Sequence, residues 1–241
     1  MAFGLFGKKS DASALRKHAE RAANRRAQAI DRWDAIQALA RMRTVEAVAA
    51  LLPRFTFYVD PSITDQEEKE AAFEAIVAMG EASLAPVSAF LKRTDSISWP
   101  IKMLDRLAGS EVVVGEVLGV LDGMDTEYAR DPQKKIQSLA TLEERRDPRI
   151  APAAARFLAD ANETVRFQAV GAILAQPERA KHAEALLTTL CREESVRVKN
   201  RILDGFIAEG WPVGARRDEI RKALPPGYVI DAEGNPRKRD A

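Results

Sequence analysis

Apolar residues recur along this chain at spacings of three and four, which place them on one face of an α-helix. Six segments carry an apolar pair at positions i and i+3: Leu39/Met42, Ile76/Met79, Leu104/Leu107, Leu139/Leu142, Val170/Ile173 and Leu203/Phe206. A second set of segments lies between them, each with apolar residues four apart, and these segments end at Leu52, Leu91, Leu121, Leu158, Leu190 and Leu224. The alternation predicts six helix pairs, each of about 34 residues.

Residues that stop helices fall between the two helices of most predicted pairs. They are Gly80, Gly109, the Asp147-Pro148 step, Pro177 and the Gly210-Trp211-Pro212 run. Glycine permits the turn after a helix, and proline cannot continue one. A helix pair standing alone would expose an apolar face, so stacking of neighbouring pairs completes the core. We therefore expect an all-α fold with helix pairs over residues 31–224.

One junction between pairs resembles a known family. The run Asp160-Ala-Asn-Glu-Thr-Val165-Arg166 is similar to the turn between HEAT repeats, in particular the bacterial HEAT-like repeats of the PBS-lyase type, and Ser195-Val196-Arg197 echoes it. The other four junctions fit by apolar spacing alone. The resemblance implies a right-handed α-solenoid of about six helix pairs, with Asp160 and Arg166 in a ladder between neighbouring repeats. It also implies a binding scaffold, since HEAT arrays are rarely enzymes.

Two segments flank the predicted repeats. Residues 1–30 form a basic N-terminal segment, in which residues 11–30 predict a helix that caps the first pair. Its basic side chains are either simply solvated or a contact surface for phosphate or an acidic protein. Residues 225–241 predict a short strand or turn folded over the last helix. Near the start, Phe3, Leu5 and Phe6 make too short an apolar patch to hold a membrane alone, and no stretch approaches a membrane span.

The longest interruption, residues 53–64, separates the first pair from the second. Its two prolines and its aromatic residues Phe55, Phe57 and Tyr58 predict an extended segment. Two interpretations of these aromatic side chains stay open. They either fill the groove between adjacent repeats or stand exposed as anchors for a protein partner.

The total charge of the chain is nearly balanced, but the charged residues are unevenly distributed along it. The 241 residues include 37 Lys plus Arg and 36 Asp plus Glu, a formal net charge of +1, which argues against a uniformly basic nucleic-acid-binding protein. Residues 60–81 are strongly acidic, whereas both ends of the chain are basic. If second helices line the concave face, as in HEAT repeats, they carry a basic patch there: Arg149, Arg156, Lys181, Arg192, Arg217 and Arg221. Each of these residues also fits an ordinary solvated helix face.

The sequence offers little material for catalysis. It has one cysteine and two histidines, so we expect no metal and no cofactor. His182-Ala-Glu184 imitates the His-x-Glu of zinc deaminases, but no Pro-Cys-x-x-Cys accompanies it. No phosphate-binding loop or nucleophile elbow is present. Because Cys191 cannot form an internal disulfide, a reducing, cytoplasmic location is favoured.

The sequence therefore predicts a cytoplasmic, non-catalytic scaffold or adaptor that binds another protein through its concave face. Two alternatives remain. The first is a nucleic-acid-binding protein that uses the basic C-terminal half, including a DNA glycosylase of HEAT-like fold, although Trp33, Trp99, Asp105 and Trp211 match no glycosylase motif. The second is a bilin lyase, which this chain resembles only through the shared repeats.

Overall fold

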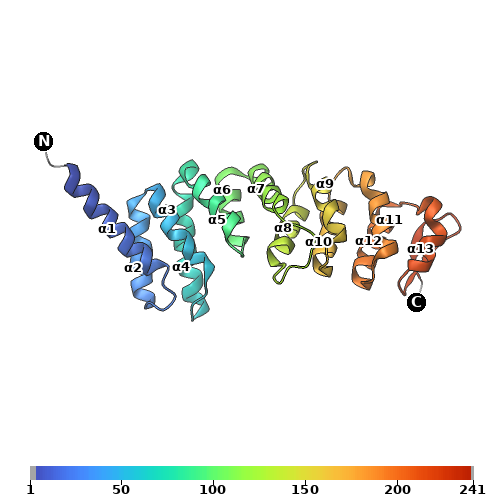
Figure 1. The fold of residues 1–241 in the computed structure, drawn as a ribbon, viewed down its shortest axis with the longest axis horizontal. Coiled ribbons are helices and arrows are strands. Elements are labelled where there is room, and N and C mark those ends of the chain that lie inside the picture. Colours follow the sequence, from blue (N-terminus) through green and yellow to red (C-terminus); the bar gives the residue numbers. More distant parts are fainter. Residues whose placement is uncertain (1–3, 240–241) are drawn as a thin grey trace. The chain divides into compact units, whose positions relative to one another are not determined.

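The computed structural model describes the backbone of residues 4–239 and the side chains of residues 11–239 (Figure 1). Within these residues the fold consists of thirteen α-helices, five short 3-10 helices and a single two-stranded hairpin. The prediction of an all-α fold is confirmed. The chain divides into two compact units, Met1–Val113 and Val114–Ala241, and the division falls inside α7 (Ser110–Asp122).

The first unit is built from helices that pack in two layers. α2 packs against α4 and α4 packs against α6, while α3 packs against α5; α1 lies against α2 and α3. The elements are α1 (Gly4–Ala22), α2 (Ala29–Met42), α3 (Val45–Leu51), η1 (Leu52–Thr56), α4 (Ser62–Val77), η2 (Gly80–Ser83), α5 (Leu84–Arg93) and α6 (Ser98–Ala108).

The second unit repeats this arrangement. α10 packs against α8 and α12, and α11 packs against η3 and α13. The elements are α8 (Gln133–Glu143), α9 (Ile150–Ala155), η3 (Arg156–Ala159), α10 (Glu163–Leu174), η4 (Arg179–His182), α11 (Ala183–Arg192), α12 (Val196–Glu209), η5 (Gly214–Arg216), α13 (Arg217–Ala223), β1 (Tyr228–Ile230) and β2 (Pro236–Lys238).

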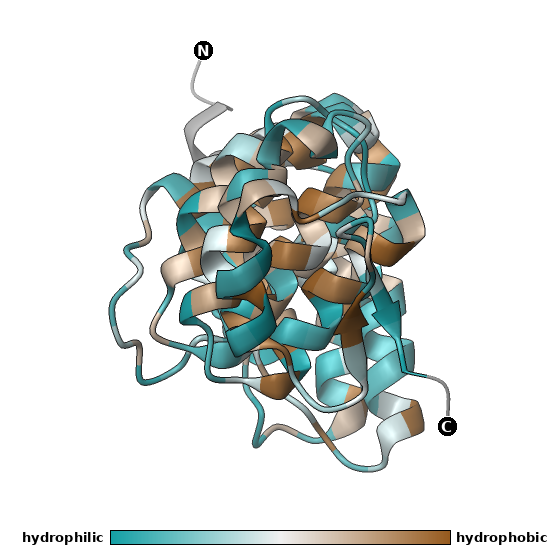
Figure 2. Cartoon of the chain, turned by 90° about the vertical axis from the view of Figure 1, so that its right-hand side faces the viewer, coloured by the Kyte–Doolittle hydropathy of each residue, from teal (hydrophilic) through white to brown (hydrophobic). Residues whose placement is uncertain are grey.

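The periodic apolar residues form the core of both units. Ile76, Leu104, Leu139, Val170 and Leu203 are each fully buried. Figure 2 shows hydrophobic and hydrophilic stretches alternating along single helices, as expected for helices that bury one face. The predicted turns also occur where expected, with glycines in the left-handed region after α4, α6 and α12, where other residues would be strained.

The N-terminal helix differs from the prediction. α1 ends at Ala22 rather than near residue 30, and it begins before residue 11. The side chain of Asn24 accepts a hydrogen bond from the backbone N–H of Arg26, and this local turn competes with continued helix, so that α2 starts at Ala29. The side chains of Phe3, Leu5 and Phe6 lie outside the described residues.

The expectation of an extended segment after the first pair is only partly correct. Residues 52–56 form the 3-10 helix η1, and only residues 57–61 lie outside a helix, with extended backbone at Phe57 and at Pro61. Pro53 lies in the first turn of η1, where its missing N–H leaves no hydrogen bond unmade. The hydroxyl of Thr56 donates to the carbonyl of Pro53 at 2.8 Å and closes this turn.

The C-terminal tail folds back as predicted. β1 and β2 pair antiparallel, with Tyr228 opposite Lys238, and the hairpin packs against α12 and α13. Asp204 on α12 accepts a hydrogen bond from the Tyr228 hydroxyl at 2.8 Å and pairs with Lys238 at 3.0 Å.

No individual helix in the described part of the chain combines the length and apolar character that a bilayer span requires, although one sharply bent pair, Ser62–Val77 with Gly80–Arg93, passes that test jointly.

Candidate functional site

A groove of about 580 Å³ runs between η3 and α11 in the second unit, on the layer formed by second helices. Small and apolar side chains, Ala155, Leu158 and Ala185, line it together with Thr189. Charged side chains also line it, among them Arg192 at the end of α11. The groove thus combines apolar with polar and charged lining residues, as many protein-binding surfaces do.

Asp160 and Arg166 both line this groove, but their side chains do not pair with each other. Each side chain pairs with a different residue instead. The carboxylate of Asp160 is 2.9 Å from Lys135 Nζ on α8. The guanidinium of Arg166 forms two parallel hydrogen bonds of 2.7 Å with Glu193, which follows α11. Arg166 also donates to the backbone carbonyl of Asp160 at 2.9 Å. Each ion pair therefore joins a first helix to the loop that follows the second helix of the same pair.

Lys135 and Glu193 are the residues that sequence reasoning missed. Lys135 is 5% exposed and Glu193 is 7% exposed, so both charges are withdrawn from solvent and depend on their partners. A sequence signal existed for the acidic member of each pair. Asp160 and Glu193 follow the terminal leucines of the second helices, Leu158 and Leu190, by two and three positions.

The electrostatics of the Arg166–Glu193 pair keep both groups ionised. Burial alone would raise the pKa of Glu193, but hydrogen bonds from Arg166 and from the backbone N–H of Ser195 outweigh it and hold this pKa below its usual value. The hydrogen bonds to Glu193 also raise the pKa of Arg166. The Arg166–Glu193 pair therefore stays ionised across the ordinary pH range.

Of the six basic residues expected on one patch, only Arg192 lines this groove. Arg149 precedes α9 and pairs with Asp147 at 2.7 Å. Arg156 turns toward α7, where it donates to the carbonyl of Leu121 at 3.3 Å and lies 3.6 Å from Asp122.

The remaining three lie elsewhere in the second unit. Lys181 is in η4 and pairs with Glu178 at 2.8 Å. Arg217 donates to the backbone carbonyls of Asp231 and Ala232 in the C-terminal hairpin. Arg221 is 3.9 Å from the exposed Asp218. Most of the basic side chains that the sequence suggested for one patch thus pair with nearby acidic side chains or backbone carbonyls instead.

The three aromatic residues of the segment 53–64 differ in exposure. One is buried, as expected for a side chain that fills a groove between helices, and one is exposed, as expected for an anchor. Phe55 is 6% exposed and packs on Trp99, with ring centroids 5.1 Å apart. Tyr58 is 75% exposed, and its ring lies 3.8 Å from the Nζ of Lys69. Phe57 lies between these extremes, half-buried beneath the guanidinium of Arg54. Phe55 is therefore part of the core, and only Tyr58 is presented to solvent.

Beneath Tyr58 the first unit buries a cluster of five charged side chains. Glu68 accepts hydrogen bonds from Arg32 and Arg54, and Asp65 pairs with Arg54 and Lys69. All five side chains are at least nine-tenths buried. Because every one of them has an internal partner, the cluster joins α2, η1 and α4 rather than presenting a reactive group.

The described residues contain no arrangement suited to catalysis by metal or thiolate. No group of three or more His, Cys, Asp and Glu side chains among them is placed to hold a metal ion. Burial raises the pKa of Cys191, and a hydrogen bond with Glu219 raises it further. The thiol therefore stays protonated and is a poor nucleophile.

The chain matches no known protein family, no characterised protein and no solved structure.

Proposed function

We propose that this chain is a HEAT-like helical-repeat protein, an α-solenoid of six helix pairs, that binds another protein without catalysis. The packing in each unit supports the proposal, because first helices contact first helices and second helices contact second helices. Stacked helix pairs produce this pattern of contacts. The glycine and proline turns between the paired helices support it as well.

The groove between η3 and α11 is the observation that carries the binding proposal. Its lining is apolar at Ala155 and Leu158 and also carries charges of both signs, the carboxylates of Asp160, Glu184, Glu193 and Glu194 and the guanidinium groups of Arg166 and Arg192. A surface that follows a phosphate backbone needs unpaired Lys and Arg side chains. Here Arg166 is paired with Glu193 and carboxylates outnumber the arginines, which favours a protein surface with charges of both signs.

A site-specific photocrosslink tests this proposal. A benzophenone amino acid replaces Thr189 in the groove, since the hydroxyl of Thr189 bonds only within its own helix, to Ala185. The matched control replaces the exposed Glu67 on α4. In the native cell, we expect a discrete protein adduct from position 189 and none of that size from position 67.

Charge reversal then tests whether the crosslinked protein binds in the groove. Arg192→Glu is expected to weaken binding of the crosslinked protein by about tenfold or more, as loss of an interface arginine often does. Lys222→Glu on α13 makes the same charge change away from the groove and should have little effect. Adducts to nucleic acid instead of protein, or equal labelling from positions 189 and 67, would refute the proposal.

A further inference from the structure

The C-terminal hairpin leaves one edge of β1 without hydrogen-bond partners. In this antiparallel pair, Arg239 N–H donates to the carbonyl of Gly227 and Asp231 N–H donates to the carbonyl of Asn235. Bonded positions alternate along such a ladder, so the backbone groups of Tyr228 and Ile230 point away from β2. Nothing else in residues 4–239 bonds the N–H or C=O of Tyr228 or of Ile230.

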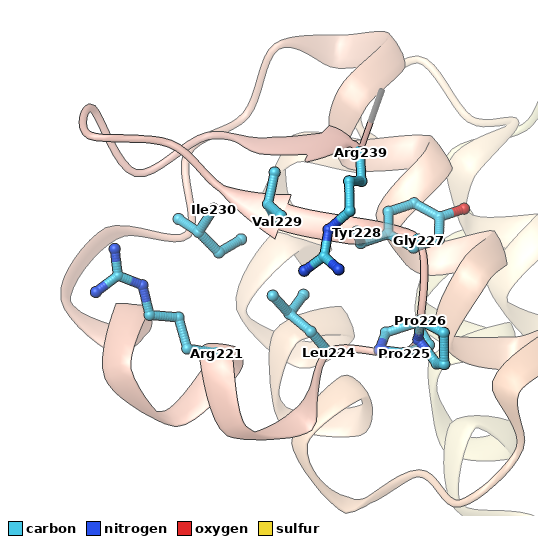
Figure 3. A pocket seen from close by; sticks show the side chains of 9 residues that line it. All are labelled: Arg221, Leu224, Pro225, Pro226, Gly227, Tyr228, Val229, Ile230 and Arg239. Atoms are coloured by element: carbon cyan, nitrogen blue, oxygen red, sulfur yellow. The ribbon is translucent and has the colours of Figure 1, made fainter. Parts of the chain in front are cut away.

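This open edge borders a groove. A space of about 490 Å³ separates β1 from the end of α13 and the turn that follows it (Figure 3). Leu224 and Pro225 line its far side, and Val229 lines it from the strand. An open strand edge beside an apolar groove is the arrangement in which an extended peptide can add as a further strand.

The charges around the groove are positive. Arg221 and Arg239 both line it, and Figure 3 shows the Arg239 side chain reaching across the strand toward Leu224. Arg239 makes no ion pair within the described part of the chain, and Arg221 has only the distant, exposed Asp218. Their guanidinium groups are therefore available to a carboxylate, which arginine binds with well-directed hydrogen bonds.

The edge is also held in place before any ligand arrives. Asp204 anchors both strands, through the Tyr228 hydroxyl and through Lys238. Backbone hydrogen bonding from Asn235, together with Arg237, lowers the pKa of Asp231 to about 2, so its carboxylate keeps the hairpin turn closed at ordinary pH. A strand that is already ordered loses little conformational entropy when a peptide binds.

We propose that the free edge of β1 binds an extended acidic peptide segment of another protein as a third strand. The peptide backbone bonds to Tyr228 and Ile230, and its carboxylate side chains bind Arg239 and Arg221. This site is separate from the groove beside α11 and does not depend on the function proposed for that groove.

Fluorescence anisotropy with a labelled peptide, Thr-Val-Glu-Val-Glu-Val-Thr, and the full chain tests the backbone part of this proposal. In an added strand, the N–H groups of alternate peptide residues point in opposite directions, one set toward β1 and the other away from it. Two N-methylated versions of the peptide are therefore compared, each with one of these two sets blocked. We expect one version to bind about tenfold or more weakly, because it loses the bonds to the edge, and the other to bind like the parent. Equal affinities of both versions and the parent, or no binding of the parent at about 1 mM, would overturn the proposal.

The charge part is tested with exposed residues, whose replacement leaves the core intact. Arg239→Gln should weaken the parent peptide by about fivefold or more, in line with the loss of a charge-assisted hydrogen bond. Lys222→Gln, on α13 but outside the groove, should leave affinity unchanged. A peptide with Gln in place of each Glu should bind Arg239→Gln and the unaltered protein equally. If Arg239→Gln and Lys222→Gln weakened binding of the parent peptide equally, the attraction would be nonspecific and the site would be refuted.

Discussion

Arg54 and Glu68 form an ion pair inside the first unit, with Arg54 Nε 2.7 Å from Glu68 Oε2 and neither side chain more than 1% exposed. Glu68 is also 3.0 Å from Arg32 Nε on α2, so one carboxylate serves two buried arginines. Such a carboxylate cannot be removed without leaving positive charge unpaired in the interior. Glu68 on α4 thus links to Arg32 on α2 and to Arg54 on η1, so the packing of these three elements is mutually dependent.

Replacing Glu68 with Gln should destabilise the first unit strongly. The amide keeps the size of the side chain but leaves Arg32 without a counter-charge and Arg54 with Asp65 alone, and loss of one partner from a buried pair costs about 3–5 kcal/mol. Urea unfolding followed by tryptophan fluorescence, to which Trp33 and Trp99 of this unit contribute, measures the change. Glu67→Gln alters the exposed neighbour and should change the free energy of unfolding by less than about 0.5 kcal/mol. Similar values for the two variants would contradict this role of Glu68.

Stability should fall in acid, and Asp65 should contribute to the fall. Burial opposes ionisation of Asp65, but hydrogen bonds from Lys69 and Arg54 outweigh it and lower its pKa below the ordinary value of 3.8. A carboxylate with a lowered folded-state pKa stabilises the protein above its unfolded pKa, and that contribution is lost as pH falls through the folded value. Asp65→Asn should therefore be less stable at neutral pH and show a flatter decline below about pH 5. Urea titrations across this range would contradict the expectation if both proteins declined with the same slope.

The Arg166–Glu193 pair should contribute more to stability than exposed ion pairs of the same unit. A double-mutant cycle with Arg166→Met and Glu193→Gln should give a coupling energy of about 1–3 kcal/mol, because the carboxylate is buried and the contact has two hydrogen bonds. The matched control is Arg197–Glu163, a pair 3.4 Å apart whose side chains are 51% and 35% exposed. Its coupling should stay below about 1 kcal/mol. Equal coupling in the two cycles would show that burial of Glu193 is immaterial.

Gly171 should tolerate alanine only when Arg201 is absent. The Arg201 side chain runs from α12 across Gly171 on α10 to Glu143 on α8, and a Cβ at position 171 would collide with both the guanidinium and the carboxylate. Alanine is otherwise about 1 kcal/mol better than glycine in a helix. We expect Gly171→Ala to destabilise the protein alone and to stabilise it in an Arg201→Ala background, because the Glu143 carboxylate then has no arginine to hold it over position 171 and can turn away. Thermal unfolding of the four proteins measures this change of sign, and the same sign in both backgrounds would refute the steric explanation.

Helices and turns were predictable because they depend on local spacing. Leu139 and Leu142 occupy one helix face by the geometry of the helix itself, and both are fully buried. Gly109 and Gly210 end α6 and α12 because they adopt positive φ without strain. The boundary of α1 was missed because the Asn24 turn is a weak local signal beside an alanine-rich run.

The candidate groove was only partly predictable. Arg192 was identified from its place at the end of a second helix, but Lys135 was not, although it pairs with Asp160 from 25 positions away. Arg156 looked equivalent to Arg192 in sequence, yet its side chain turns back to the carbonyl of Leu121. Long charged side chains reach partners on several sides, and spacing along one helix does not select among them.

The amino-acid order was therefore sufficient to predict the all-α fold, most of its helices and their buried faces, since these follow from backbone geometry and the burial of apolar residues. Only the packed structure decided which charges find partners, as for Glu143 and Arg201, which are 58 positions apart. It alone also decided which surfaces stay open, the groove beside α11 and the edge of β1. The physical reason is that ion pairing and exposure depend on distances between elements, which arise only when the helices stack.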